Sequence, residues 1–319
     1  MFHIIALGEI LIDFTPRGVS ENSNALFERN PGGAPCNVLA TMSKFGRKTG
    51  FIGKVGADDF GYFLRDVMMQ NRINIDNLYV TDKYPTTLAI VHLNEQGDRS
   101  FSFYRNNSAD VMLDVNDIDA TSIANSRIFH FGSLSLTDNP ARDATLKALD
   151  IAKEKNVVIS YDPNLRPPLW DSLDRAKEMM VHGLRYANVV KMSQEELEFI
   201  TGENELIDGC ESIMKQYGTK LIFVTLVSGG AFYYHKNAYK KIDTYDVQVV
   251  DTTGAGDIFM GAALHRLLEY NLDLDSLTEQ NLDEICWFAN VAGALSTTKT
   301  GAIPSIPSLE EILSIYKTS

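Results

Sequence analysis

Short apolar runs alternate with helix-length segments along most of the chain. Six of these runs have the length of a strand, and they lie at 4–8, 49–55, 127–131, 157–161, 188–192 and 221–227. Strands that alternate with helices form parallel βαβ units, and the crossover helices cover the resulting sheet. The pattern therefore predicts an α/β fold, a doubly wound parallel sheet flanked by helices on both faces.

Three further segments alternate like strands but have no helix between them. They lie at 10–14, 86–93 and 100–105. Gly97-Asp98, between the last two, is a hairpin signal. We expect a small antiparallel lid, formed by residues of about 10–31 and 84–110, within a single domain that spans 1–319.

The lid sheet, if uncovered, would expose one apolar face. We expect Leu88, Ile90, Phe101 and Phe103 to lie on that face. Exposed apolar sheet surfaces favour association. The pattern therefore predicts a homodimer that forms through the lid.

The composition excludes several classes of protein. With 319 residues and 45% hydrophobic content, the chain can bury one large core. Its 42 acidic and 29 basic residues give a formal charge of -13, which argues against a nucleic-acid partner. Any phosphate ligand must therefore be held locally, by backbone amides, a metal ion and a few Arg or Lys residues.

Cysteine usage and the N-terminal residues bear on location. Cys36, Cys210 and Cys286 are far apart and odd in number, which indicates neither a disulfide framework nor a zinc site. The chain starts directly with a strand pattern, without the regions of a signal peptide. No apolar run approaches the length of a membrane span. We expect a cytoplasmic protein with no membrane partner.

The strongest chemical signal is the run Asp251-Thr252-Thr253-Gly254-Ala255-Gly256-Asp257, which leads into an apolar helical stretch. Small residues let backbone N–H groups approach a ligand, and a helix that begins there adds unpaired donors and a positive dipole end. This arrangement suits phosphate, and Asp257 could act as a base beside it. The alternative is an ordinary helix start, where Asp and glycine-rich turns are common.

One N-terminal residue, Asp13, suits a ligand that carries several hydroxyl groups, and a second N-terminal feature indicates a turn before a helix. Asp13 follows an apolar run where a strand would leave the core, and its carboxylate could accept hydrogen bonds from two neighbouring hydroxyls. The segment Asn30-Pro31-Gly32-Gly33-Ala34-Pro35-Cys36-Asn37 precedes a helix that should end near Gly46. Each feature is also compatible with a simple turn.

The run at 251–257 matches the pattern D-T-x-G-A-G-D and resembles the signature of the ribokinase-like (pfkB-type) carbohydrate kinases. The segment 30–37 is similar to the N-terminal signature of that family. The resemblance implies that Asp257 is the catalytic base and that the amides of Gly254–Gly256 form an anion hole. It also implies sugar contacts from Asp13, Gly32, Gly33 and Asn37.

Segments 99–110, 129–133 and 160–170 look like the fructokinase branch of the family, and the similarity extends along nearly the whole chain. This resemblance implies that Phe103 and Arg105 contact the sugar and that Arg166 reaches the sugar or the moving phosphoryl group. It also implies transfer of the γ-phosphoryl group of ATP to the primary hydroxyl of fructose, giving fructose 6-phosphate.

Two alternatives stay open. In a 2-keto-3-deoxygluconate kinase of the same family, Arg105 and Arg166 would clamp the substrate carboxylate. A non-catalytic binding protein could have kept the fold and lost the chemistry, although the intact segment 254–257 argues against this. A protein kinase is excluded because the Asp59-Phe60-Gly61 tripeptide has neither an H-R-D loop nor a glycine-rich strand.

The resemblance also implies sites for ATP and Mg²⁺. The segment 191–196 lies where the family usually carries N-x-x-E, a motif tied to magnesium and phosphate through water, and Glu196 matches its Glu while Ser193 replaces its Asn. Ser193 and Glu196 could equally form a helix capping box. The implied nucleotide contacts are Lys191, Ser193, Thr225, Gly230 and Asn290. Val227 replaces a usual glycine beside Thr225.

A loop near the C-terminus looks like the one that holds a monovalent cation such as K⁺ in many relatives. The resemblance implies that Asp251, Thr253, Gly301 and Ser305 form this site.

Overall fold

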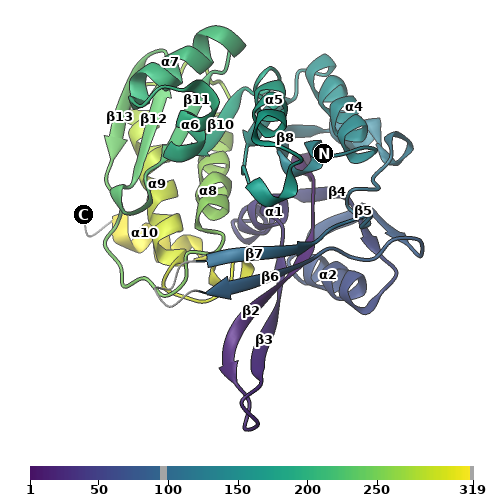
Figure 1. Cartoon of the computed structure of the whole chain (residues 1–319). Helices are drawn as coiled ribbons and strands as arrows, with labels where there is room; N and C mark the ends of the chain where they lie inside the picture. The colour runs from purple at the N-terminus through teal and green to yellow at the C-terminus, as the bar shows by residue number, and fades with distance from the viewer. Residues whose placement is uncertain (94–98, 317–319) are drawn as a thin grey trace.

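The computed structural model describes residues 1–93 and 99–316, and a large sheet forms its centre (Figure 1). The strands of this sheet are β1 (Phe2–Leu7), β4 (Thr49–Gly56), β5 (Ile73–Thr81), β8 (Ser126–Gly132), β9 (Val158–Asp162), β10 (Val189–Ser193), β11 (Leu221–Thr225), β12 (Ala231–His235) and β13 (Ala238–Ile242). Their order is β13-β12-β11-β10-β9-β8-β1-β4-β5. All pairings from β11 to β5 are parallel, and β12 and β13 add two antiparallel pairings at one edge.

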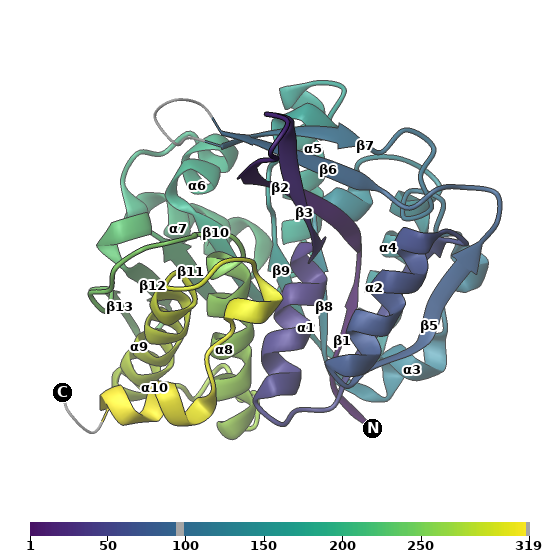
Figure 2. The same cartoon turned by 90° about the horizontal axis from the view of Figure 1, so that it is seen from below.

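Helices cover both faces of this sheet (Figure 2). One layer contains α1 (Ala34–Lys44), α2 (Asp59–Gln70), α8 (Ala255–Glu269), α9 (Glu279–Ser296) and α10 (Leu309–Tyr316). The other contains α3 (Ala120–Ala124), α4 (Ala141–Glu154), α5 (Leu173–Leu184), α6 (Gln194–Thr201) and α7 (Leu206–Tyr217). The predicted α/β fold is confirmed. In the described part of the chain, no helix is long and apolar enough to cross a membrane.

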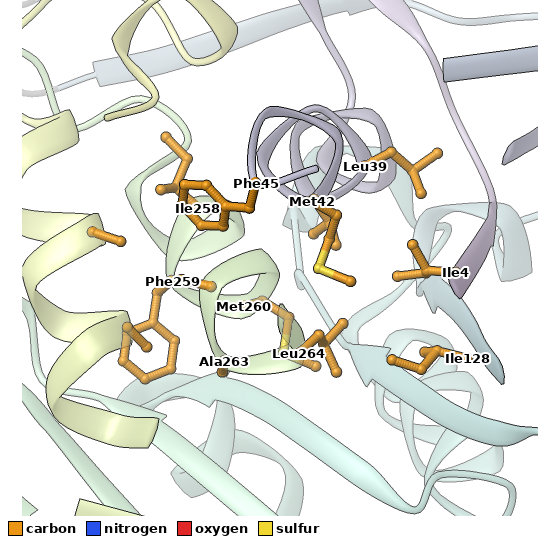
Figure 3. Packing of buried hydrophobic residues seen from close by; sticks show 14 of the residues in the cluster. Ile4, Leu39, Met42, Phe45, Ile128, Ile258, Phe259, Met260, Ala263 and Leu264 are labelled. Carbon is orange, nitrogen blue, oxygen red and sulfur yellow. The ribbon is translucent and has the colours of Figure 1, made fainter. Parts of the chain in front are cut away.

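The alternation of side chains along the central strand separates two hydrophobic cores. Ile4 of β1 lies in the cluster with α1 and α8, whereas Ile5 belongs to the cluster on the opposite face, with α4 and α5. Figure 3 shows Ile4 near Leu39 and Met42 of α1, with Leu264 of α8 in the same cluster. Burial of each such side chain stabilises the fold by about 1.5–3 kcal/mol. Helices on both faces are therefore firmly packed on the sheet, and this packing holds the ends of the strands in place.

A second, smaller sheet forms the lid. It contains β2 (Leu11–Val19), β3 (Ala25–Gly32), β6 (Leu88–Leu93) and β7 (Arg99–Tyr104), in the order β3-β2-β6-β7. The β2–β3 and β6–β7 pairings are antiparallel, and β2 pairs with β6 in parallel. In Figure 1 the β2–β3 hairpin projects from the body of the molecule. The predicted hairpin residues Gly97 and Asp98 lie outside the described residues.

The predicted apolar face of the lid is wrong. Phe103 of β7 pairs with Ala89 of β6, so Phe101 and Phe103 share the face of Ala89. Leu88 and Ile90 alternate with Ala89 and therefore point to the opposite face. The four apolar side chains are divided between the two faces of the sheet.

Candidate active site

Several polar side chains lie where parallel strands of the main sheet end. Asp162 is the last residue of β9, Ser193 of β10 and Thr225 of β11. These strands are parallel, so their carboxyl ends share one edge of the sheet. Open α/β sheets bind ligands at that edge.

The turn before α8 forms an anion cradle. Gly254 has a left-handed φ of 76°, and α8 has no side-chain cap. A Cβ at Gly254 would lie 2.5 Å from the Ala302 Cβ, so only glycine fits. An uncapped helix start presents N–H groups and the positive end of the dipole to a ligand. This geometry suits the predicted anion hole at 254–256.

Asp257 lies half-buried in the first turn of α8. Asn37 Nδ2 donates a hydrogen bond of 2.8 Å to Asp257 Oδ2 and so fixes the carboxylate. Burial raises the pKa of Asp257, while Lys191, the Asn37 hydrogen bond and Arg166 oppose the rise. A fixed carboxylate with a raised pKa beside an anion cradle is suited to accept a proton from a nucleophile.

Asp13 lies on β2, opposite Asn30 of β3. Burial raises the pKa of Asp13 to about 6, although Arg166 opposes the rise. A Cβ at Gly32 would lie 2.1 Å from Asp13 Oδ2. Glycine therefore lets the end of β3 lie directly against the carboxylate of Asp13.

Gly33 and Glu9 fix the start of α1, the helix that carries Asn37. Gly33 has a φ of 116° and is the N-cap residue, and a Cβ there would lie 2.4 Å from the Glu9 backbone oxygen. Ala34 N–H donates to Glu9 Oε1 at 3.0 Å. Burial raises the pKa of Glu9 to about 7. No role was predicted for Glu9, because the isolated residue matches no chemical pattern.

Arg166 faces the lid from the main domain. Its backbone is left-handed, with a φ of 44°, and its guanidinium carbon lies 6.0 Å from the ring centre of Phe101. Phe101 and Phe103 stack with their ring centres 5.8 Å apart. Both rings line a cavity of about 890 Å³ that also contacts Trp170. Phe101 therefore lies between Phe103 on the lid strand and Arg166, the two residues that were predicted to reach the sugar.

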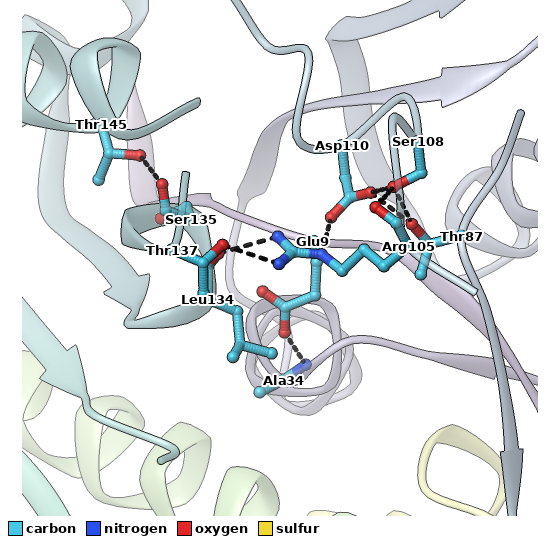
Figure 4. Close-up of polar contacts among 10 residues, drawn as sticks. All are labelled: Glu9, Ala34, Thr87, Arg105, Ser108, Asp110, Leu134, Ser135, Thr137 and Thr145. Atoms are coloured by element: carbon cyan, nitrogen blue, oxygen red, sulfur yellow. Dashed lines mark hydrogen bonds and ion pairs between the residues drawn. The ribbon is translucent and has the colours of Figure 1, made fainter. Parts of the chain in front are cut away.

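Arg105, a predicted sugar contact, makes three contacts within the protein (Figure 4). Its Nε lies 2.7 Å from Asp110 Oδ2, and its terminal nitrogens donate to Thr137 Oγ1 and the Leu134 carbonyl oxygen, each at 2.8 Å. The residue is only 8% exposed. Because these protein acceptors already hold the guanidinium, Arg105 ties the end of β7 to the main domain.

Ser193 and Glu196 form the predicted capping box at the start of α6. Ser193 N–H donates to Glu196 Oε2 at 2.8 Å, and Leu165 N–H donates to Glu196 Oε1 at 2.9 Å. The carboxylate thus joins the start of α6 to the segment that leads to Arg166. In the described part of the chain, no group of three or more His, Cys, Asp or Glu side chains is arranged to hold a metal ion. An ion at Glu196 would need water or phosphate as further ligands.

A cavity of about 570 Å³ extends from the cradle along α8 and α9. Ala255 and Gly256 line one part of it, and Asn290 and Ala294 of α9 line another. Its shape suits a nucleotide whose phosphates reach the cradle.

Three of the five predicted nucleotide residues, Thr225, Gly230 and Asn290, line this cavity, whereas Lys191 and Ser193 are not among its lining residues. Thr225 and Gly230 line it, and a Cβ at Gly230 would lie 2.2 Å from the Ile242 carbonyl oxygen. Asn290 Nδ2 donates to that same oxygen at 2.9 Å. Asn290 therefore holds the wall of the cavity, in addition to any contact with a base.

Val227 is strained in the structure. It has a left-handed φ of 52° and is 81% exposed on the rim of the cavity. A β-branched residue in this conformation stores about 1–2 kcal/mol of strain. Glycine would remove this strain, and the free-energy cost of its greater freedom in the unfolded chain is smaller than the strain. β11 ends at Thr225, two residues before the predicted end of the strand, because neither Leu226 nor Val227 has an extended backbone.

Replacing Val227 by glycine should raise the free energy of unfolding by about 0.5–1 kcal/mol, measured by urea titration. Val249 offers a matched control, because it lines the same cavity, is 58% exposed and does not have a positive φ. Val249→Gly should lower the free energy of unfolding. Equal destabilisation by both substitutions would contradict the assignment of strain to Val227.

The predicted cation loop is held together by Asp251. Its carboxylate accepts hydrogen bonds from the N–H groups of Thr253 at 2.8 Å and Gly301 at 2.9 Å. Ser305 is buried, and its hydroxyl donates to the Ala302 carbonyl oxygen. The structure therefore brings the four predicted residues to one loop junction beside the cradle.

The ion pair between Lys191 and Asp162 was missed by sequence analysis. Lys191 Nζ lies 2.7 Å from Asp162 Oδ2, and both residues are almost completely buried. The sequence offers one signal for this pair: Asp162 directly follows an apolar run. Functional groups often lie at that position, the carboxyl end of a parallel strand.

Comparisons with known proteins agree with this geometry. The model of the pfkB family carbohydrate kinases matches residues 1–309. A probable fructokinase-2 from Arabidopsis thaliana is 40% identical over 316 residues, which cover 98% of this chain and 95% of the relative.

Solved structures of bacterial fructokinases superpose closely. The fructokinase of Xylella fastidiosa with bound ATP has a TM-score of 0.91 at 30% identity, over 100% of this chain and 99% of that chain. A fructokinase double mutant from Vibrio cholerae, with fructose, ADP and a potassium ion bound, has a TM-score of 0.87 at 29% identity, over 98% of both chains.

Proposed function

The chain belongs to the pfkB family of carbohydrate kinases, and we propose that it transfers the γ-phosphoryl group of ATP to the primary hydroxyl of fructose. The products are fructose 6-phosphate and ADP. The observation that carries the proposal is the position of Asp257, which Asn37 holds at 2.8 Å beside the uncapped start of α8. The nucleotide cavity contacts the same turn through Gly256.

Each residue of the site has a defined task in this reaction. Asp13 and the Gly32-Gly33 backbone bind the sugar, and Asp257 orients its primary hydroxyl. That hydroxyl oxygen forms a bond to the γ-phosphorus as the bond to the β,γ-bridging oxygen breaks, and Asp257 accepts the hydroxyl proton. The amides at 254–256 and Arg166 stabilise the charge on the moving phosphoryl group.

The site also suits the cations that we propose as cofactors. Glu196 would hold Mg²⁺ through water, and the loop of Asp251, Thr253, Gly301 and Ser305 would hold K⁺. The fit rests on the oxygen atoms present, because carboxylate, hydroxyl and carbonyl oxygens are the ligands of such cations. When bound, Mg²⁺ would neutralise charge on the β- and γ-phosphates.

The contacts of Arg105 favour fructose over 2-keto-3-deoxygluconate. A carboxylate clamp would need two available guanidinium groups, and Arg105 is already paired with Asp110. The direct test measures ADP release with Mg²⁺-ATP and, in parallel, fructose, 2-keto-3-deoxygluconate, ribose, adenosine or no sugar. Turnover with fructose supports the proposal. Preference for the keto-acid would restore the carboxylate clamp, and inactivity with every acceptor would favour a binding protein.

Asp13 should make sugar affinity depend on pH. Asp13→Asn is expected to raise the KM for fructose about 10- to 100-fold, because hydrogen bonds to a carboxylate are stronger than those to an amide. In the wild type, KM should rise as the pH falls below about 6, where Asp13 becomes protonated. The control is the same pH series for Asp13→Asn, whose KM should stay flat. A wild-type KM for fructose that does not change with pH across this range would contradict the proposed role of Asp13 in sugar binding.

A homodimer through the lid and a cytoplasmic location stay predictions. The tip of the β2–β3 hairpin exposes Val19, Leu26 and Phe27, which are 68%, 45% and 43% exposed. This apolar surface supports the dimer in place of the single face predicted from β6 and β7. Sedimentation of the wild type and of Phe27→Glu would test it, because the substitution should shift a dimer toward monomer.

A further inference from the structure

Lys191 lies directly against the phosphate cradle. It belongs to β10, is 5% exposed, and its ammonium is 2.7 Å from Asp162 Oδ2. A Cβ at Gly256 would lie 2.9 Å from Lys191 Nζ. The absence of a side chain at Gly256 therefore lets the ammonium approach the turn from the side of the sheet.

The surroundings of this ammonium are strongly acidic. The carboxylates of Asp162, Glu196 and Asp257 all act on Lys191. Two backbone N–H groups already bind Glu196, whereas Asp162 Oδ1 is buried without a hydrogen-bond partner among the described residues.

Arg166 is the other cationic side chain that acts on Asp257, and Asp13 adds a further carboxylate near Arg166. Burial lowers the pKa of His130 to about 3 and raises the pKa of the Cys36 thiol, so both are neutral near pH 7. Lys191 is the ammonium on the sheet side of the cradle.

Transfer of a phosphoryl group adds negative charge to a site that already contains these carboxylates. An ammonium fixed in a low-dielectric environment stabilises such charge without having to reorganise. We propose that Lys191 is a positioning residue for phosphoryl transfer: held by Asp162, its ammonium lies behind Gly256 and balances the negative charge of Asp257 and of the transferring phosphoryl group. This inference rests on the proposed kinase function.

The first test is Lys191→Met, which removes the charge and keeps an unbranched side chain. We expect kcat to fall about 10²- to 10³-fold, while the KM values for ATP and fructose change by less than about threefold. The matched control is Lys220→Met, because Lys220 pairs with Asp275 at 3.0 Å on the surface. The control should keep wild-type kinetics. A kcat of Lys191→Met within about tenfold of the wild type would overturn the proposal.

A double variant distinguishes a role of Lys191 in phosphoryl transfer from a purely structural role, in which Lys191 only neutralises the buried Asp162. In Lys191→Met with Asp162→Asn, both partners of the buried pair are neutral, so the stability lost in the single variant should return. The proposal expects kcat to stay low in the double variant. Recovery of kcat together with stability would show that Lys191 only neutralises Asp162, and it would also overturn the proposal.

A measurement without turnover separates this inference from the kinase function itself. ¹³C NMR can follow the titration of the Asp257 carboxyl in the ligand-free wild type and in Lys191→Met, with Asp257→Asn to assign the signal. Loss of the ammonium should move the titration at least about one pH unit upward. An unchanged titration contradicts the inference. Wild-type inactivity with every sugar would instead contradict the proposed function.

Discussion

Asp257→Asn should lower kcat with fructose by about 10²- to 10⁴-fold, the range that a general base contributes. The amide keeps the size of the side chain and cannot accept the hydroxyl proton. Nucleotide affinity should change little, because the cradle is formed by backbone amides and by Gly254, whose conformation does not depend on the carboxylate. The measurement is kcat from ADP release together with ATP binding by calorimetry.

Asp275→Asn is the matched control, because Asp275 lies on the surface and pairs with Lys220 and Lys236. It should retain full activity. A near-wild-type kcat in Asp257→Asn would remove Asp257 from the role of base. Loss of ATP binding along with kcat would instead assign Asp257 to the structure of the cradle.

Arg105→Met is expected to lower the free energy of unfolding by about 3–5 kcal/mol, measured by urea titration. Removal of the guanidinium leaves Asp110 buried with an uncompensated charge. Burial by itself would raise the pKa of Asp110, but Arg105 and the hydroxyls of Thr87 and Ser108 hold this pKa below its usual value. This contribution to stability is present above the usual carboxyl pKa and is lost as the pH falls through the lowered value.

Arg175→Met is the control for this prediction, because Arg175 pairs with Glu178 on the surface at 2.7 Å. Its loss should cost less than about 1 kcal/mol. Arg105→Met/Asp110→Leu should recover much of the stability, since no charge is then left unpaired. If Arg105→Met kept its stability and raised only the KM for fructose, the original prediction of a sugar ligand would stand.

The layered fold was predictable because each strand and helix is indicated by a short stretch of sequence, through the spacing of its apolar residues and its length. The apolar run at 157–161 became β9 with a shift of one residue. The strands β5 and β13 were not predicted, because polar residues such as Asn74 and Lys240 interrupt their apolar pattern. The short strand β12 was not predicted either, although its sequence is rich in aromatic residues.

The uncapped glycine turn before α8 was also predictable, because consecutive residues form it. Asp251 to Asp257 contain the glycines, the helix start and the carboxylate together. Contacts between distant segments were not predictable in the same way. Asn37 meets Asp257 across 220 positions, and the direction of the Arg105 side chain follows from tertiary packing that spacing does not encode. The faces of Phe101 and Leu88 required the strand register.

The position of β1 has a consequence for the synthesis of the chain. This strand precedes both of its partners in the sequence, yet it lies between β4 and β8, and Ile4 pairs with Thr49 on one side and Ile128 on the other. Closing such long loops costs entropy that is recovered only once both partners have formed. A nascent chain therefore keeps one edge of β1 unpaired until β8 leaves the ribosome, and an unpaired apolar strand edge favours aggregation during that interval.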